Sequence, residues 1–113
     1  MKTVGAVMFI SAAIVFSAQV GFAQSGDARA GKAAFTKSCA TCHGLDGNSP
    51  KDAIAKLLKV EIPKLGAPQV QAKKDPEIKK TITEGYEKMK PVKGLTDKEV
   101  QNIMAFMRTI PKP

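Results

Sequence analysis

Two cysteines and one histidine stand close together in the sequence, as Cys39, Cys42 and His43. On a helical turn, side chains three and four residues apart project toward the same side, so all three share one face. Two thiols at this spacing can add to the two vinyl groups of one haem, and the adjacent imidazole then lies beneath the iron. The chain contains 1 histidine, so any imidazole chemistry must run through His43. The motif therefore predicts covalent haem attachment.

Three other chemistries use the same residue types. A structural zinc site needs about four protein ligands, and the sequence offers only three obvious candidates. A thioredoxin-like redox pair follows a strand in a βαβ context, which the sequence lacks. A structural disulfide between Cys39 and Cys42 suits an oxidising compartment, but it does not require histidine at position 43. Haem attachment accounts for all three residues together.

A methionine after the motif can supply the second axial ligand to iron. Histidine with methionine is typical of low-spin electron-transfer haems, and it raises the reduction potential because the thioether prefers ferrous iron. Met104 and Met107 fall on the apolar face of a predicted helix, where core packing is expected. Met89 lies in a predicted loop between Gly85 and Pro91, where a flexible backbone can bring sulfur to iron. We therefore expect Met89 to be the ligand, the alternative being a solvent-exposed loop residue.

The first element that must position the motif is a helix. Asp27 provides an N-cap, and residues 28–39 are rich in alanine and lysine. Gly31 and Phe35 lie four residues apart on this helix and share a face. The motif comes at its end, where Gly44 suits a stop.

The middle of the chain is expected to be mostly irregular. Residues 45–50 and 62–68 contain glycine and proline at positions typical of turns and loops. Residues 53–58 are expected to form one or two helical turns.

Two longer helices are predicted in the second half. Asp75 is the predicted N-cap of the first, followed by a proline at the first helical position, and Gly85 closes it. Thr96 and Glu99 match a capping box at the start of the second. Its apolar residues recur at helical spacing, namely Val100, Ile103, Met104, Phe106, Met107 and Ile110. No segment alternates like a strand, so the predicted fold class is all-α, with three main helices plus short helical turns.

Residues 1–23 resemble a secretory signal peptide. After an N-terminal lysine, an apolar run extends from Val4 to Val20, and small residues precede a cut after Ala23. The run is near the lower limit for crossing a bilayer, about 17–25 residues, so cleavage is favoured over an uncleaved membrane anchor. We expect one mature domain, residues 24–113, in the periplasm or another extracytoplasmic compartment.

The mature domain has few large side chains and many positive charges. Its only aromatic residues are Phe35, Tyr86 and Phe106, so something else must fill the centre, and a haem would. Without the leader, 17 basic residues face 10 acidic ones. Solubility explains most of this excess, while the net field also steers encounters with acidic partners. Nucleic acid binding is not expected, because the chain is exported and has no aromatic-rich basic stretch.

Taken together, these residues resemble class I cytochromes c, particularly the short single-haem bacterial type. The resemblance covers nearly all of the mature domain. It rests on Gly31 and Phe35, on the motif at 39–44, on the loop at 85–91 and on residues 96–110. It implies a small cytochrome c fold around one covalently bound haem c, and an electron carrier rather than an enzyme.

The resemblance also implies roles for residues outside the motif. The first and last helices of that family cross at a glycine and aromatic residues, so Gly31 and Phe35 are expected to meet Phe106. A proline carbonyl after the motif is expected to accept a hydrogen bond from the free nitrogen of the histidine, and Pro50 is the best match. Apolar residues that line the haem pocket by the same analogy are Leu65, Ile82, Val92 and Leu95.

The expected function is one-electron transfer between larger redox proteins, by a monomer with both axial positions of iron filled. Lys37, Lys88, Lys90 and Lys93 are expected near the exposed haem edge, facing acidic docking surfaces. Membrane association is expected only if the N-terminal segment stays uncleaved. Two alternatives remain: a haem subunit of a larger oxidoreductase, or a five-coordinate haem peroxidase or gas-binding protein if Met89 is not a ligand.

Overall fold

The computed structural model describes residue 5, residues 13–14 and residues 26–113. The predicted leader and its cut after Ala23 lie outside the described residues, apart from those three positions, and stay a prediction. Within the described part of the chain, no helix is both long enough and apolar enough to cross a membrane.

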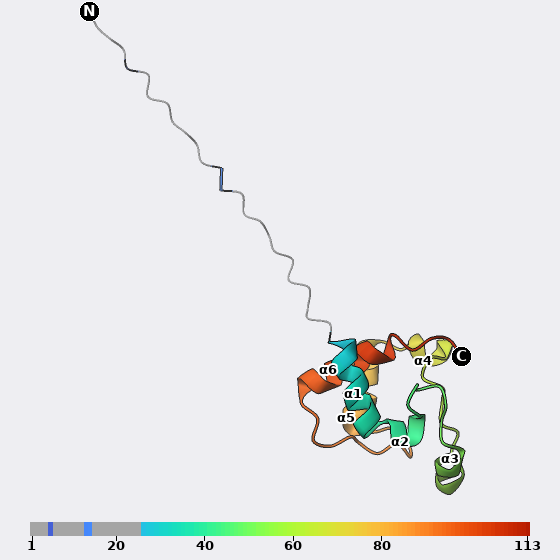
Figure 1. The fold of residues 1–113 in the computed structure, drawn as a ribbon. Helices are drawn as coiled ribbons and strands as arrows, with labels where there is room; N and C mark the ends of the chain where they lie inside the picture. The colour runs from blue at the N-terminus through green and yellow to red at the C-terminus, as the bar shows by residue number, and fades with distance from the viewer. Residues whose placement is uncertain (1–4, 6–12, 15–25) are drawn as a thin grey trace, which may run out of the picture.

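Helices make up the regular structure of the described residues (Figure 1). In chain order they are α1 (Ala28–Ser38), α2 (Ala40–His43), α3 (Asp52–Leu58), α4 (Pro68–Gln71), α5 (Asp75–Glu84) and α6 (Asp97–Met107). Over residues 26–113, the only strand-like pairing is an isolated bridge between Tyr86 and Met89. The all-α prediction is confirmed, with α1, α5 and α6 as the three main helices.

The crossing of α1 and α6 is the closest backbone approach between the long helices. A Cβ added at Gly31 would overlap the carbonyl oxygen of Asn102 and lie 3.0 Å from the Cβ of Phe106. Beside this point, the rings of Phe35 and Phe106 pack with centroids 5.0 Å apart, tilted by 58°. The predicted meeting of Gly31, Phe35 and Phe106 is confirmed.

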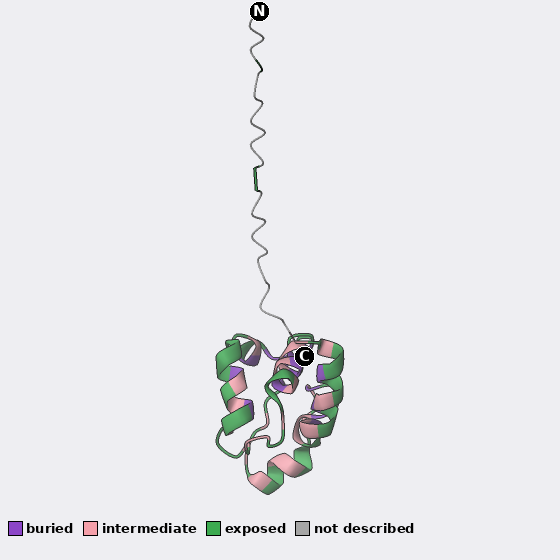
Figure 2. Ribbon diagram, turned by 90° about the vertical axis from the view of Figure 1, so that its left-hand side faces the viewer, coloured by how far each residue is buried: buried purple, intermediate pink, exposed green. Residues whose placement is uncertain are grey.

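The core lies between the inner faces of the long helices, as the buried residues in Figure 2 show. Its buried members are Phe35, Ala40, Leu65, Val70, Ile78, Ile82, Val100, Ile103, Phe106, Met107 and Ile110. Val92, Leu95 and Met104 are partly buried and pack against this cluster. Both predicted pocket residues Leu65 and Ile82 therefore belong to the core, although their relation to a haem stays a prediction.

Most helix ends follow the local signals in the sequence. The Asp27 carboxylate accepts hydrogen bonds from the N–H groups of Arg29 and Ala30, which satisfies donors that lack a helical partner. Thr96 and Glu99 form the predicted capping box. Gly85 ends α5 with φ at 82°.

Two expectations about helix ends are corrected. Lys74, not Asp75, is the N-cap of α5, and Asp75 is its first helical residue. The Asp75 carboxylate instead accepts hydrogen bonds from Arg108 at 2.7 and 3.2 Å, because a guanidinium fork is a stronger donor than a backbone amide. The short helix α4 begins at Pro68, in a segment expected to be loop, because proline is well suited to the first helical turn.

Replacing Gly31 with alanine tests the helix crossing. The new methyl group meets backbone of α6 that cannot turn aside, so we expect a loss of about 1–3 kcal/mol in the free energy of unfolding. The measurement is urea unfolding of the purified protein. Ala33→Leu, on the exposed face of the same helix, adds more atoms and should change stability by less than about 0.5 kcal/mol. Equal losses in the two variants would contradict the tight crossing.

Candidate functional site

The cysteine–histidine motif forms a helical turn directly after α1. The backbone breaks at Cys39, which has φ at −122°, and then winds into α2. The N–H of His43 donates to the carbonyl of Cys39 at 3.0 Å. Gly44 ends the turn with φ at 78°, a conformation that favours glycine. Because Cys39 and His43 are joined by a helical hydrogen bond, their side chains project to the same side.

Both cysteines are half-buried and neither forms a disulfide. Burial raises the pKa of the Cys39 thiol to about 11, and the neighbouring Cys42 adds to the shift. Cys39 is therefore a neutral thiol at pH 7 when no group is bound to it. Among the described residues, no group of three or more His, Cys, Asp or Glu side chains is arranged to hold a metal ion. The site thus lacks the features of a zinc centre.

The His43 ring is largely enclosed, and burial lowers its pKa. The ring is consequently neutral near pH 7, which is the form that binds a metal. Its Nδ1 is the single buried side-chain nitrogen or oxygen in the described part of the chain that has no hydrogen-bond partner. A metal-binding histidine normally donates its second ring N–H to an acceptor that fixes the ring. The unpaired Nδ1 therefore fits a ring whose final orientation is fixed only when a group is bound.

The carbonyl that acts on His43 is that of Pro63. It opposes the effect of burial by raising the pKa of the imidazole, although Nδ1 does not reach hydrogen-bond geometry in this structure. Pro50, the choice made from the sequence, lies half-buried in the loop after α2. We correct that choice to Pro63. The chain around Pro50 also returns to the motif, but there the N–H of Lys51 donates to the carbonyl of Cys42 at 2.9 Å, and the carbonyl that acts on the imidazole is that of Pro63.

Met89 lies in a tight turn that follows α5. The N–H of Tyr86 donates to the carbonyl of Met89 at 2.9 Å, and the N–H of Met89 donates to the carbonyl of Tyr86 at 2.8 Å. Glu87, at the corner, has φ at 51°. The predicted loop is confirmed, and two reciprocal hydrogen bonds close its first residues into a turn. Met89 itself is half-buried, whereas its neighbours are exposed.

The other two mature methionines behave as core residues. Met107 is buried, and Met104 is partly buried against the core cluster. Both belong to α6 and contact apolar neighbours. Their expected packing role is confirmed, and Met89 is left as the methionine outside the main core.

The motif and the Met89 turn belong to opposite halves of the site. Helix α2 packs on α1, and α5 packs on α6, while α1 and α6 pack on each other. Among the described helices, no comparable packing joins α2 to α5. The two halves share the core cluster, which includes Ala40 of α2 and Ile82 of α5. The free thiols and the unpaired Nδ1 fit a cofactor bound beside the motif.

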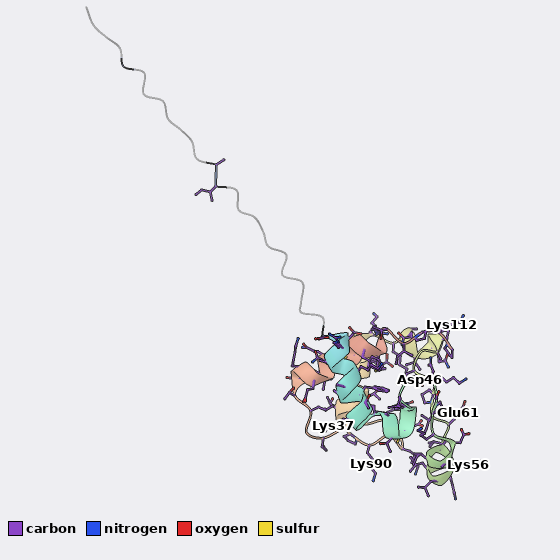
Figure 3. All side chains as sticks on the ribbon, in the orientation of Figure 1. Lys37, Asp46, Lys56, Glu61, Lys90 and Lys112 are labelled. Atoms are coloured by element: carbon purple, nitrogen blue, oxygen red, sulfur yellow. The ribbon has the colours of Figure 1, made fainter. Side chains whose placement is uncertain are left out.

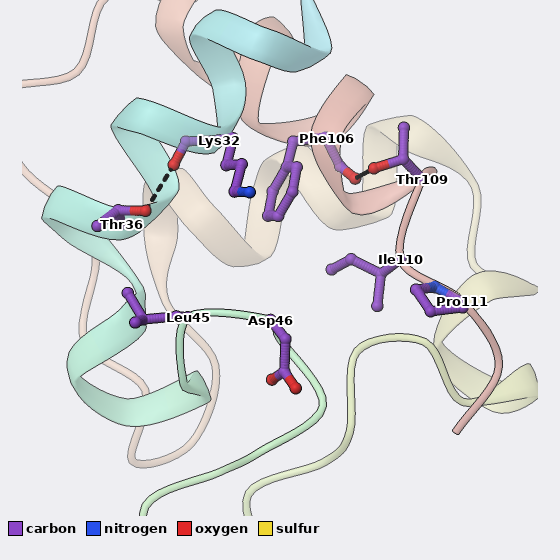
Figure 4. Close-up of a pocket in the computed structure, with 8 residues that line it drawn as sticks. All are labelled: Lys32, Thr36, Leu45, Asp46, Phe106, Thr109, Ile110 and Pro111. Carbon is purple, nitrogen blue, oxygen red and sulfur yellow. Dashed lines mark hydrogen bonds between the residues drawn. The ribbon is translucent and has the colours of Figure 1, made fainter.

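A cavity elsewhere on the domain is not this site. It has a volume of about 410 Å³ and lies between α1, the loop after α2 and the chain beyond α6 (Figure 4). It is lined by Lys32, Thr36, Leu45, Asp46, Phe106, Thr109, Ile110 and Pro111. Its two hydroxyl groups donate to nearby backbone carbonyls, Thr36 to that of Lys32 and Thr109 to that of Phe106. Neither His43 nor Met89 lines it, so it is not the cofactor site.

Three residues that fasten the elements carrying the site were not found from the sequence. Asn102 is buried in α6, and its Oδ1 accepts a hydrogen bond from the N–H of Asp27 at 2.8 Å. Asn48 and Pro63 lie in segments that were predicted only as loops. Asn102 offered one signal, since a polar residue at a core position of a helix needs a partner. The other two offered none, because their partners are far away in the sequence.

Known proteins resemble this chain over most of its length. Residues 26–107 match the family described as cytochrome c oxidase, cbb3-type, subunit III. Cytochrome c-555 of Chlorobaculum tepidum is 36% identical over 107 residues, which cover 88% of this chain and 93% of the relative. The solved structure of the KustC0563 c-type cytochrome is similar with a TM-score of 0.61 and 34% identity, covering 73% of this chain and 98% of that one.

The turn that carries Met89 can be tested at Gly85. A Cβ added there would lie 2.6 Å from the Met89 carbonyl and 2.9 Å from Cδ of Pro91. Gly94 has a similar φ of 77° but open space around its Cα. Gly94→Ala should cost only the left-handed backbone strain, about 1–2 kcal/mol. Gly85→Ala should cost about 1–3 kcal/mol more in thermal or urea unfolding. Equal costs would show that the turn is not tightly packed.

Proposed function

This chain belongs to the c-type cytochromes, and from that premise we propose that it carries single electrons between larger redox proteins outside the cytoplasm. Its cofactor is a covalently bound haem c, and its role is electron transfer. The axial ligands, the compartment and the partner chemistry are our proposals. The observation that carries them is a half-buried His43, whose buried Nδ1 has no partner, on a helical turn with two free cysteines.

In this proposal, Cys39 and Cys42 hold the haem through two thioether bonds, and His43 and Met89 bind its iron. When bound, the haem supplies a couple between ferric and ferrous iron. The neutral His43 presents a ring nitrogen, and the carbonyl of Pro63 is the acceptor for the opposite N–H. The tight turn holds Met89 in one backbone conformation, so little rearrangement is needed when an electron arrives.

The apolar surroundings are the second contribution of this chain. Leu65 and Ile82 are buried, and Val92 and Leu95 are partly buried. Apolar side chains keep water from the haem, which disfavours the ferric form and raises the potential. With both axial positions filled, no substrate reaches iron. These properties suit an electron carrier.

Acidic redox proteins are the proposed partners. Lys37, Lys88, Lys90 and Lys93 are all exposed. Figure 3 places Lys37 and Lys90 toward the lower edge of the domain, the side on which α2 lies, whereas Lys112 is at the upper edge. Opposite charges accelerate encounter without requiring a large interface, so the complexes are expected to be short-lived. The predicted leader at 1–23 supports an extracytoplasmic site for them.

A second candidate function is that of a haem subunit held permanently in a larger oxidoreductase. The family match favours it, because the name of that family describes an oxidase subunit. The native mass of the haem-loaded protein isolated from its own cells separates the candidates. An electron shuttle runs as a small monomer, whereas a subunit runs with its complex.

The ligand proposal is tested by Met89→Ala in the haem-loaded protein. We expect loss of the sulfur-to-iron charge-transfer band of the ferric state and a lower reduction potential, because a thioether favours ferrous iron. Met104→Ala and Met107→Ala should keep the band. A band that survives in Met89→Ala would overturn the assignment, and a high-spin wild-type spectrum would favour the five-coordinate alternative.

The docking proposal is tested by charge reversal. The double variant Lys88→Glu/Lys90→Glu should slow electron transfer to an acidic redox protein about tenfold at low ionic strength, with the difference shrinking as salt screens the charges. The matched control is Lys112→Glu, on the opposite edge of the domain in Figure 3. Equal slowing in both variants, or a rate that does not depend on salt, would contradict a defined docking side.

A further inference from the structure

We propose that Asn48 is a positioning residue for the haem site, and that it holds the segment 63–66 against His43. This inference rests on the proposed ligation of iron by His43 and extends it to a residue with no contact to the cofactor. Asn48 lies five residues after His43, in the loop between α2 and α3.

The side-chain amide of Asn48 joins two distant segments of the chain. The N–H of Gly66 donates to its Oδ1 at 2.8 Å, and its Nδ2 donates to the carbonyl of Pro111 at 2.8 Å. A backbone N–H can only donate and a proline carbonyl can only accept, so the two contacts fix which end of the amide is which. The N–H of Asn48 itself donates to Asp46 Oδ1 at 2.9 Å, which holds the loop around it.

The segment that Asn48 holds is enclosed between two layers of backbone. The N–H of Leu65 donates to the carbonyl of Gly47 at 2.9 Å. On the other side, a Cβ at Gly66 would overlap the carbonyl oxygen of Pro111. Gln71 Nε2 donates to the carbonyl of Leu65 at 2.8 Å and to that of Met107 at 3.0 Å. Leu65 and Gly66 therefore have their backbone groups tied to the loop after α2 and to the end of α6.

The helix that precedes Pro63 is weakly anchored to the rest of the domain. The preceding helix, α3, has no buried residue, and Leu57 on it is 76% exposed. Within the described residues, α3 has no extensive contact with another helix. The anchored backbone nearest to Pro63 is therefore that of the residues that follow it, Leu65 and Gly66.

These contacts close a ring that begins and ends at His43. The backbone runs from His43 to Asn48, crosses by the side-chain amide to Gly66, and returns through Leu65 to the carbonyl of Pro63. The backbone bonds from the Gly47 N–H to the Gly44 carbonyl at 3.2 Å and from the Leu65 N–H to the Gly47 carbonyl at 2.9 Å keep this segment beside the histidine, whose Nδ1 lacks a partner. Gly66 is three residues from Pro63, so its position is transmitted to that carbonyl through Lys64 and Leu65. Asn48 thereby sets how well His43 is oriented.

The test compares haem-loaded wild type with Asn48→Ala by proton NMR of the oxidised protein and by redox titration. Without the contacts of Asn48, the hydrogen bond that His43 Nδ1 donates to the Pro63 carbonyl in the haem-loaded protein is expected to be weaker. We expect the Nδ1 proton to exchange with solvent several-fold faster, up to about tenfold. We also expect a higher reduction potential, because an imidazole with a weaker acceptor stabilises ferric iron less.

Ser49→Ala is the matched control. Ser49 lies next to Asn48, and its hydroxyl donates only to Asp46, at 2.9 Å. Both the exchange rate and the potential should stay at their wild-type values in this variant. If they move as far as in Asn48→Ala, general loosening of the loop is responsible and the inference is wrong.

A second variant provides the test if Asn48→Ala does not fold or does not bind haem. Asn48→Asp retains an acceptor for Gly66 and loses the donor to Pro111, so its Nδ1 exchange should be faster than in wild type but slower than in Asn48→Ala. If the Nδ1 proton of His43 exchanges at the wild-type rate in whichever variant folds, the proposed role of Asn48 is wrong. A wild-type protein without hyperfine-shifted His43 signals would instead overturn the proposed ligation, so the two failures are distinguishable.

Discussion

The structure depends on the contact between the backbones of α1 and α6 at Gly31. Helix α1 carries the cysteine–histidine motif at its C-terminal end, and α6 supports α5 and therefore the Met89 turn. This crossing is the most extensive contact between helices in the described residues, so its angle contributes to how the motif and the Met89 turn face each other. A small residue at a helix crossing thus influences a site to which it contributes no side chain.

Local chemistry made much of the fold predictable. The cap at Asp27, the capping box at Thr96 and the stop at Gly85 each involve atoms within four residues of one another. The motif of two cysteines and a histidine is equally local, because its geometry is that of one helical turn. The family resemblance added the meeting of Phe35 with Phe106, which spacing alone could not give.

What the sequence did not reveal are pairings between distant residues. Asp75 was read as a cap, yet its carboxylate pairs with Arg108, 33 positions away. The partner of Asn48 at Pro111 is 63 positions away. Single-sequence patterns carry no information about such pairs, since any exposed arginine or free carbonyl would serve equally well. The same limit explains why Pro63 was missed.

The exposed character of α3 gives the domain a region free to change in length. No side chain of this helix is buried, and the chain on both sides is fastened, before it by the bond from the Lys51 N–H to the Cys42 carbonyl at 2.9 Å and after it at Leu65. The entropy of closing a loop grows only slowly with the number of residues in it. A segment of a different length between Lys51 and Leu65, or a peptide inserted there, is therefore compatible with the same electron-transfer core.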